Sequence, residues 1–195
     1  MEKKYSGNGI PIPGKSNIDP RQVMARVERE FFISDAVTVA QRLPGMEIVI
    51  AGPDPGLKRY MITETEAYLG SGDKACHASR GRTARTEIMF AQGGHLYLYL
   101  VYGMHWMMNI VTGAKDDPQA VLIRGAAPFS GPGRVTRGIG TDGSFNGEDI
   151  TVSGRIWLED TGFKPVLKAG PRVGINYAGE PWVSKPWRFI IDEQN

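Results

Sequence analysis

The chain has 195 residues, enough for one sizeable domain, and hydrophobic residues make up 41% of it, which supports a packed core. The formal net charge is only +2, so composition alone does not indicate a nucleic-acid-binding protein, and the single cysteine, Cys76, excludes an internal disulfide framework and fits a reducing compartment. No apolar run approaches the roughly 18 residues of a membrane span, and the first residues lack the apolar segment of a signal peptide, so we expect the cytoplasm, with association to the nucleoid if the source is bacterial.

Two helices are predicted before the first strand. Residues 1–20 are polar with scattered Gly and Pro and are expected to form a flexible extension, which leaves residues 21–195 for the folded domain. Asp19-Pro20 resembles a helix start, with a short helix through Val23 and Val27. Ser34 is the expected N-cap of a second helix, which ends at Pro44-Gly45.

Strand patterns follow and continue to the end of the chain. Residues 46–52 and 57–68 are predicted to form a hairpin around a turn at 53–56, and residues 95–111 form two further strands that reverse at Tyr102-Gly103. Other predicted strands are 120–126, 155–160, 172–180 and 186–192, and short helices are expected within 86–91 and 131–140. Because strands and helices do not alternate, we predict an α+β domain with a largely antiparallel sheet, flanking helices and one protruding hairpin.

Two glutamates, Glu64 and Glu66, lie two positions apart in the second predicted strand. In an extended chain they share one face, where two adjacent carboxylates repel each other. Such a pair is suited to cleaving a glycosidic bond through an oxocarbenium-like transition state. The alternative is that the alternation of Thr and Glu marks an ordinary solvent-exposed face.

Basic residues are concentrated in two stretches that contain no acidic residue. Residues 79–86 hold Arg80, Arg82 and Arg85, and residues 118–141 hold Arg124, Arg134 and Arg137. Both are rich in Gly and other small residues, which let backbone amides approach an anion. Contact with DNA phosphates is one interpretation, and ordinary solvated loops are the other.

Histidines and tyrosines are the remaining candidates. His77, His95, His105 and Cys76 match no common zinc spacing, so we expect no metal. The tyrosines of the strand at 95–102 either belong to the core or bind bases. Tyr102, at the expected hairpin tip, favours the second interpretation, because an exposed aromatic ring stacks well on an unstacked base.

Several short segments occur together in a fixed order. They are "ETEAY" at 64–68, "HASRGRT" at 77–83, "MF" at 89–90, "LYLYLVYGMHWMMN" at 96–109, "AVLIRGAAP" at 120–128, "GPGR" at 131–134, "SFNGEDI" at 144–150, "PRVGINYAGE" at 171–180 and "PWRF" at 186–189. Together they resemble the alkyladenine (3-methyladenine) DNA glycosylase family, from about residue 30 to the end. Two departures from the family pattern are Thr86, where asparagine is common, and Leu43-Pro44-Gly45, where a second leucine is more usual.

The resemblance implies a monofunctional enzyme, without metal or other cofactor, that removes alkylated or deaminated purines from double-stranded DNA and leaves an abasic site in base excision repair. It implies that Glu66 activates water, that Arg124 positions the water or the backbone, and that Tyr102 enters the minor groove in place of the flipped nucleotide. It assigns base binding to Tyr68, His77, Tyr99 and Asn109, and we assign backbone contacts to Arg80, Arg82, Arg85, Arg134 and Arg137.

Two other functions remain open from the residues alone, and in each case we expect a monomer. An inert DNA-damage-binding protein would have no use for Glu66. A nucleoside hydrolase would need neither the wedge at Tyr102 nor the arginine-rich loops.

Overall fold

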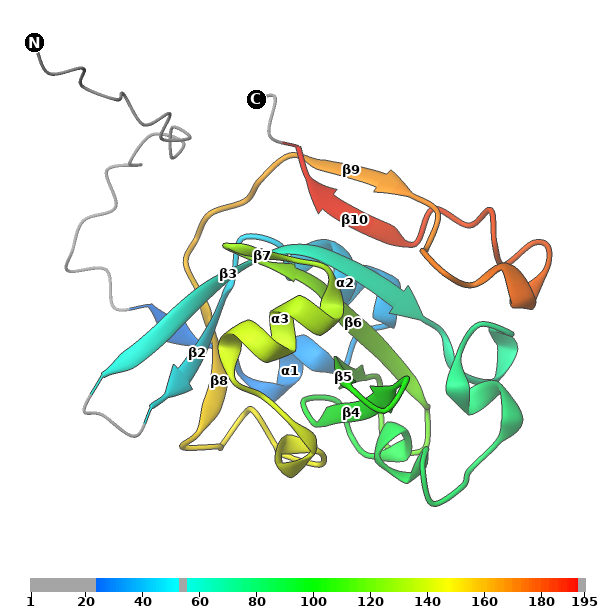
Figure 1. The fold of residues 1–195 in the computed structure, drawn as a ribbon, viewed down its shortest axis with the longest axis horizontal. Coiled ribbons are helices and arrows are strands. Elements are labelled where there is room, and N and C mark those ends of the chain that lie inside the picture. The colour runs from blue at the N-terminus through cyan, green and yellow to red at the C-terminus, as the bar shows by residue number, and fades with distance from the viewer. Residues whose placement is uncertain (1–23, 53–55, 193–195) are drawn as a thin grey trace, which may run out of the picture.

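The long strand β3 (Leu57–Tyr68) lies at the centre of the sheet in the computed structural model, which describes residues 24–52 and 56–192 (Figure 1). It pairs antiparallel with β2 (Glu47–Ala51), β6 (Gln119–Ala126) and β10 (Arg188–Ile191). The sheet continues in the order β1-β8-β2-β3-β6-β5-β4, and every pairing is antiparallel. This arrangement confirms the predicted α+β class with a largely antiparallel sheet.

The remaining elements surround this centre. The other strands are β1 (Ala25–Arg26), β4 (Leu96–Val101), β5 (His105–Thr112), β7 (Phe129–Ser130), β8 (Ile156–Asp160) and β9 (Leu167–Gly170). The helices are α1 (Arg29–Phe32), α2 (Ala36–Arg42) and α3 (Pro132–Ile139), with 3-10 turns at Gly70–Gly72, His77–Arg80, Glu87–Phe90, Gly143–Phe145 and Asn176–Ala178. None of the helices in the described part of the chain has the length and apolarity needed to cross a bilayer.

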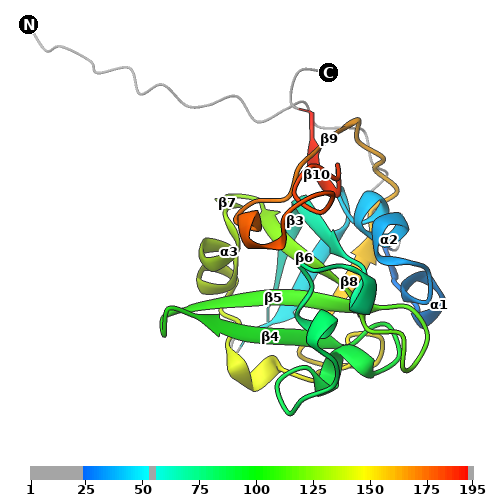
Figure 2. The same cartoon turned by 90° about the vertical axis from the view of Figure 1, so that its right-hand side faces the viewer.

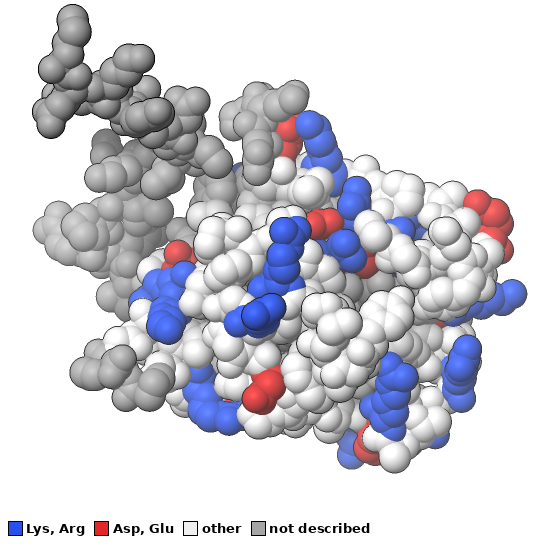
Figure 3. All heavy atoms as spheres, in the orientation of Figure 1, with Lys and Arg blue, Asp and Glu red and all other residues white. Residues whose placement is uncertain are grey.

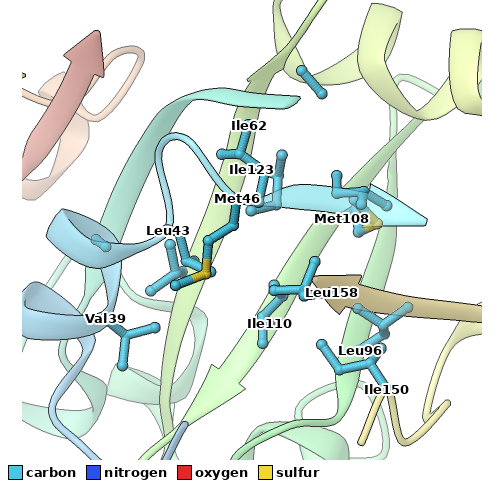
Figure 4. Close-up of a cluster of buried hydrophobic side chains, with 14 of the residues drawn as sticks. Val39, Leu43, Met46, Ile62, Leu96, Met108, Ile110, Ile123, Ile150 and Leu158 are labelled. Atoms are coloured by element: carbon cyan, nitrogen blue, oxygen red, sulfur yellow. The ribbon is translucent and has the colours of Figure 1, made fainter. Parts of the chain in front are cut away.

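The hydrophobic core lies between the sheet and the helices. Figure 2 shows α1 and α2 on the side of the molecule opposite α3. Helix α2 buries Ala36, Val39 and Ala40, which recur at the spacing of one helical face. Figure 4 shows side chains from β3, β4, β5, β6 and β8 meeting those of α2 in one continuous cluster, which joins all these elements into a single domain.

The helix predicted through Val27 is not formed in the part of it that the structure describes. Residues 25–26 form strand β1 on β8 instead of a helix through Val27. The side chain of Arg26 donates hydrogen bonds to the carbonyls of Ile150 (2.8 Å) and Ser153 (2.7 Å), so long-range pairing overrides the local helical pattern. Residues 1–23, with the expected extension and the helix start at Asp19-Pro20, lie outside the described residues, as do residues 53–55 of the predicted turn.

Two further predictions are corrected. The N-cap of α2 is Asp35, not Ser34, because the Asp35 carboxylate accepts hydrogen bonds from the amides of both Val37 and Thr38. Residues 172–180 contain only a 3-10 turn instead of a strand, and two glycines at positive φ, Gly174 and Gly179, interrupt the extended conformation. On the side away from β3, β10 pairs with β9, a strand that was not predicted.

The β4–β5 hairpin extends beyond the rest of the molecule, as predicted (Figure 2). The strands stay in register from the Leu96–Ile110 pair to the Val101–His105 pair. At the tip, Tyr102 (φ 52°) and Gly103 (φ 69°) both have left-handed backbones, and the Tyr102 side chain is 88% exposed. The register therefore places a bulky residue, in a conformation it rarely adopts, at the most exposed point of the hairpin.

Candidate active site

A cavity of about 300 Å³ opens on one face of the sheet, at the lower end of the volume range for small-molecule pockets. Its walls come from four neighbouring strands, two loops, the 3-10 turn at Glu87–Phe90 and the start of α3. The residues that line it include Tyr68, Ala75, Cys76, His77, Tyr97, Tyr99, Val101, Met107, Asn109, Leu122, Arg124, Pro132, Val173 and Tyr177. The site residues predicted from β3, β4, β5 and β6 are thus brought together in three dimensions.

Strand register explains this convergence. Glu66 on β3 lies opposite Leu122 on β6, which in turn lies opposite Asn109 on β5, and Asn109 lies opposite Tyr97 on β4. Directly paired residues of an antiparallel sheet share a face. The four residues therefore form one row across the sheet, with the carboxylate at one end and the aromatic wall at the other.

Glu64 and Glu66 share a guanidinium. Arg124 Nε lies 3.2 Å from Glu64 Oε1 and 3.4 Å from Glu66 Oε1. Arg188 Nη1 also lies 3.3 Å from Glu64 Oε1. Glu64 is only 7% exposed and Glu66 has no exposed surface, so the alternative of an ordinary solvent-exposed face is wrong. Two adjacent buried carboxylates are tolerated because cations compensate them.

An irregularity in the β3–β6 ladder supports this arrangement. The partners are Ile62–Ala126, Glu64–Gly125 and Thr65–Ile123, so the register skips Thr63 on one strand and Arg124 on the other. Gly125 has to lack a side chain, because a Cβ there would lie 2.5 Å from Thr63 Oγ1 and 3.0 Å from the Cβ of Glu64. The bulge and the glycine let Arg124 reach both carboxylates.

Both oxygens of the Glu66 carboxylate accept hydrogen bonds. Its Oε1 accepts a hydrogen bond from the amide of Val173 (2.7 Å), and its Oε2 accepts one from the Tyr68 hydroxyl (2.8 Å). Burial raises the pKa of Glu66 above its ordinary value, while Arg124, the Val173 amide and the Tyr68 hydroxyl oppose that rise. Glu66 does not itself line the cavity, whereas three residues that contact it (Tyr68, Arg124 and Val173) do.

Aromatic rings form much of the cavity wall. The His77 ring lies edge-on to Tyr99 with 4.5 Å between centroids, and the rings of Tyr97 and Tyr99 are 5.5 Å apart. His77 Nδ1 lies 2.9 Å from the Tyr97 hydroxyl. Burial, with help from Arg85 and Arg80, lowers the pKa of His77 to about 4, so the ring is neutral near pH 7 and keeps one N–H to donate.

The tyrosine hydroxyls stay protonated. The pKa values of Tyr68 and Tyr99 are raised above the ordinary value, mainly by burial. The negative charge of Glu66 raises both of them further. Two neutral, electron-rich rings therefore line the cavity, and the face of such a ring attracts a cationic ligand.

Asn109 is buried at the inner end of the cavity. Its Nδ2 donates hydrogen bonds to the carbonyls of Tyr97 (3.1 Å) and Met107 (3.4 Å). The donors of this amide are thus used within the hairpin, and these bonds fix the orientation of the side chain at a position that also lines the cavity. Asn109 therefore both stabilises the hairpin and occupies a position in the cavity lining.

The hairpin tip is next to the cavity. Val101 and Met107, which line it, belong to the two strands that carry the tip, and Pro132 at the start of α3 lines it as well. Tyr102 does not line the cavity and projects from the tip together with Met104, which is 70% exposed. The structure therefore separates the exposed tyrosine from the tyrosines of the cavity wall.

The predicted backbone-binding arginines differ in their surroundings. Arg80, Arg134 and Arg137 are exposed. Arg82 is also exposed but forms ion pairs with Asp116 and, at 3.6 Å, with Glu87. Arg85 lies over the Tyr99 ring at 5.3 Å, beside the cavity. Figure 3 shows basic side chains spread over one face of the molecule, with fewer acidic ones among them.

Thr86, which departs from the family pattern, is buried in its loop. It accepts a hydrogen bond from the amide of Thr83 (2.9 Å) and donates one to the carbonyl of Gly81 (3.0 Å). In this chain a hydroxyl thus holds the loop between Arg80 and Arg85 in place.

Among the residues that the structure describes, no three His, Cys, Asp or Glu side chains are grouped as metal ligands. His77 lies in the cavity wall, while His95 and His105 occupy opposite ends of the β4–β5 hairpin. Cys76 is buried, and burial raises the pKa of its thiol to about 11, so it is not a thiolate near pH 7.

Sequence reasoning missed three groups at this site. The Val173 amide, which binds Glu66, is a backbone group and has no signal in residue type. Asp73 and Arg172 form a buried ion pair behind Tyr68, although they are 99 positions apart in the chain. The motif at 171–180 contains Arg172 and Val173, and their place in that motif was the one available signal.

Comparisons with known proteins identify the family of this chain. The family model of methylpurine-DNA glycosylase (MPG) matches residues 30–195. A relative from Methanocella arvoryzae is 39% identical over 186 residues, which cover 85% of this chain and 92% of that protein. Relatives from Borrelia garinii (39% over 180 residues, covering 86% and 96%) and Borreliella afzelii (41% over 181 residues, covering 85% and 96%) are similar. All three carry the name "Putative 3-methyladenine DNA glycosylase". With this match along most of its length, the chain belongs to the methylpurine-DNA glycosylase family.

Proposed function

We propose that this DNA glycosylase flips a damaged purine out of double-stranded DNA into the cavity, hydrolyses its N-glycosidic bond with Glu66 as general base, and leaves an abasic site. The observation that carries the proposal is the Glu66–Arg124 pair directly behind an aromatic cavity sized for one small ligand. DNA glycosylase activity in the repair of alkylated bases is the activity of the family.

Base flipping follows from the depth of the site. A base within a duplex cannot reach a carboxylate behind a cavity wall, so the nucleotide has to rotate out of the stack. Unstacking costs a few kcal/mol, least at damaged or weakly paired bases. We assign Tyr102 to the vacated position, because it is the most exposed aromatic residue described and the strands that carry it also line the cavity.

Binding of the flipped purine uses the cavity wall. Tyr68 and Tyr99 offer ring faces, to which an N-alkylated, positively charged purine is attracted. Neutral His77 supplies a hydrogen-bond donor for the base or its sugar-phosphate, and Asn109 limits the shape of the inner end. Exposed Arg80, Arg134 and Arg137 lie on surface segments where they can contact phosphates, with Arg82 and Arg85 as further contacts.

The chemical step needs one water. Its oxygen forms a bond to C1′ of the sugar as the bond from C1′ to the purine nitrogen breaks, and the electron pair leaves with the purine. Glu66 takes the proton of the water. A carboxylate has about four acceptor positions. The Val173 amide and the ion pair with Arg124 lie at Oε1, and the Tyr68 hydroxyl uses one position on Oε2, so we assign the remaining position on Oε2 to the water. No lysine is assigned as a nucleophile, so the product is an intact abasic strand. Separately, we expect the enzyme to act as a monomer.

Incubation with duplex oligonucleotides tests the proposal. Each duplex carries one defined lesion, and alkaline cleavage afterwards reports abasic sites. Wild-type protein should release at least one N-alkylated purine, Glu66→Gln should release none, and Glu30→Gln, a matched change at an exposed residue of α1, should behave as wild type. Binding without release by wild type would indicate an inert damage-binding protein, and release from free nucleosides would indicate a nucleoside hydrolase.

A further inference from the structure

Asp73 and Arg172 form an ion pair with no exposed surface on either side chain. Arg172 Nη2 donates to Asp73 Oδ1 at 2.9 Å, and Nη1 donates to Asp73 Oδ2 and, at 2.9 Å, to the carbonyl of Ala67. Removing two charges from water is costly, and buried ion pairs often stabilise a fold no better than apolar residues of the same size. Stability alone therefore does not account for the pair.

The guanidinium lies directly behind the base-binding wall. Its central carbon is 4.8 Å from the centroid of the Tyr68 ring and 4.9 Å from that of Trp187, so it is enclosed between two aromatic rings. Tyr68 lines the cavity, whereas Arg172 does not. The Tyr68 ring thus stands between a buried cation and the space where a purine would stack.

The same arginine precedes the residue that holds the general base. The amide of Val173 donates to Glu66 Oε1 at 2.7 Å, and Tyr68 donates to Glu66 Oε2. Asp73 also accepts a hydrogen bond from the amide of Ala75 at 3.0 Å, and Ala75 lines the cavity. The ion pair therefore connects the stacking ring, the carboxylate and the loop at the cavity edge.

We propose that Asp73 and Arg172 form a charge-compensated support for Tyr68, in which Asp73 cancels the guanidinium charge that would otherwise repel a cationic purine stacked on the cavity side of the ring. The pair positions Tyr68 for every substrate, and Asp73 determines whether a positively charged base is accepted. This inference rests on the proposed function and adds a basis for selecting cationic over neutral purines.

Removing the charge of Asp73 should lower the preference for cationic bases. Without Asp73, the positive charge of Arg172 acts on the base across one aromatic ring, in a region where water screens it little. A cationic base is then disfavoured and a neutral base is not. We expect the ratio of excision rates, 7-methylguanine over hypoxanthine, to fall by roughly tenfold to a hundredfold in Asp73→Asn, the size of a unit-charge interaction across about 6–12 Å at an effective dielectric constant of about 20.

The test measures single-turnover excision of both bases, each placed in the same duplex context. The double variant Asp73→Asn/Arg172→Gln removes both charges and should return the ratio to the wild-type value, even if both rates are low. Asp149→Asn, which breaks an Asp–Arg pair with Arg29 outside the site, should leave the ratio unchanged. If wild type excises only one of the two bases, the ratio of duplex affinities in a Glu66→Gln background replaces the ratio of rates.

The outcomes distinguish a role of the ion pair in selecting cationic bases from a role in the fold alone. A lower ratio in Asp73→Asn that the double variant restores supports the inference. An unchanged ratio, an equal loss on both lesions, or an Asp73→Asn protein that is unfolded in a thermal melt assigns the pair to the fold alone and overturns the inference. Wild-type protein that releases no N-alkylated purine from any of the lesion duplexes would instead refute the proposed function, so the two failures are distinguishable.

Discussion

Glu66→Gln changes one atom and one charge of the assigned general base and keeps its size. In the native site, Glu66 Oε1 accepts from the Val173 amide at 2.7 Å and Oε2 accepts from the Tyr68 hydroxyl at 2.8 Å. A glutamine can point its carbonyl at Val173 and its amide nitrogen at Tyr68, because a hydroxyl group accepts as well as donates. Both neighbours remain hydrogen-bonded, so the site should keep its shape.

The stability of this variant follows from the pKa of Glu66. A carboxyl whose folded pKa is raised stabilises the fold below its unfolded pKa, and this contribution is lost as pH rises through the folded pKa. Because burial raises the pKa of Glu66, its ionised form costs folding free energy at neutral pH, and glutamine removes that cost. Loss of the 3.4 Å contact with Arg124 acts in the other direction, although Arg124 keeps Glu64 at 3.2 Å. We expect the free energy of unfolding to stay within about 1 kcal/mol of wild type.

Activity should respond very differently. A general base contributes about 10²–10⁴ in rate, or roughly 2.7–5.4 kcal/mol of barrier. In wild type, the rate of base release should rise with pH through the raised pKa of Glu66, and the variant should lack this rise. Single-turnover release across a pH series, with affinity for an abasic-site analogue measured in parallel, provides the comparison. A rate within about threefold of wild type, or an affinity that falls as much as the rate, would refute the assignment of Glu66 as the base.

Four other expectations are directly measurable. Glu64→Gln should reduce base release by no more than about tenfold, because Glu64 orients Arg124 without contacting the water, and a loss as large as that of Glu66→Gln would contradict this role. Tyr102→Ala should leave the melting temperature unchanged and lose more activity on a paired lesion than on an unpaired one, since the side chain is exposed, and equal losses would exclude a wedge. Asn109→Ser should raise excision of mispaired guanine relative to hypoxanthine by roughly tenfold to a hundredfold, and an unchanged ratio in a folded protein would remove Asn109 as the discriminating residue. Affinity for undamaged duplex should fall steeply between ~50 and ~200 mM salt, and a flat response would contradict phosphate contacts by exposed arginines such as Arg134.

Much of the sheet could be predicted because its strands have a local pattern. β3, β4, β5 and β6 are rich in aromatic, β-branched and other apolar residues, and the pair Tyr102-Gly103 marks the reversal between two of them. The errors occur where long-range contacts decide the conformation. Residues 25–26 become a strand because β8 pairs with them, and β9 becomes one because β10 pairs with it. Neither partner is identifiable from the local sequence.

In the candidate site, too, some features could be predicted from local sequence and others depend on long-range contacts. The common face of Glu64 and Glu66 follows from strand alternation, whereas the resemblance implied only that Arg124 positions water or the backbone, and its contact with both carboxylates comes from the structure. The register skip at Thr63 and Arg124 has no local signature, and it is what lets one guanidinium reach two carboxylates. The neutrality of His77 is equally invisible in sequence, because it depends on burial and on arginines from the neighbouring loop.

The backbone of Tyr102 has a consequence for protein engineering. A reversal with two successive positive φ angles favours Asn-Gly, and a tyrosine at its first position costs conformational free energy that no contact of its exposed ring repays in the free protein. A search for heat-resistant variants guided by turn preferences would therefore replace Tyr102 early. Such a variant would melt higher and, if Tyr102 is the wedge, repair DNA poorly, so selection for thermostability and selection for repair act on this residue in opposite directions.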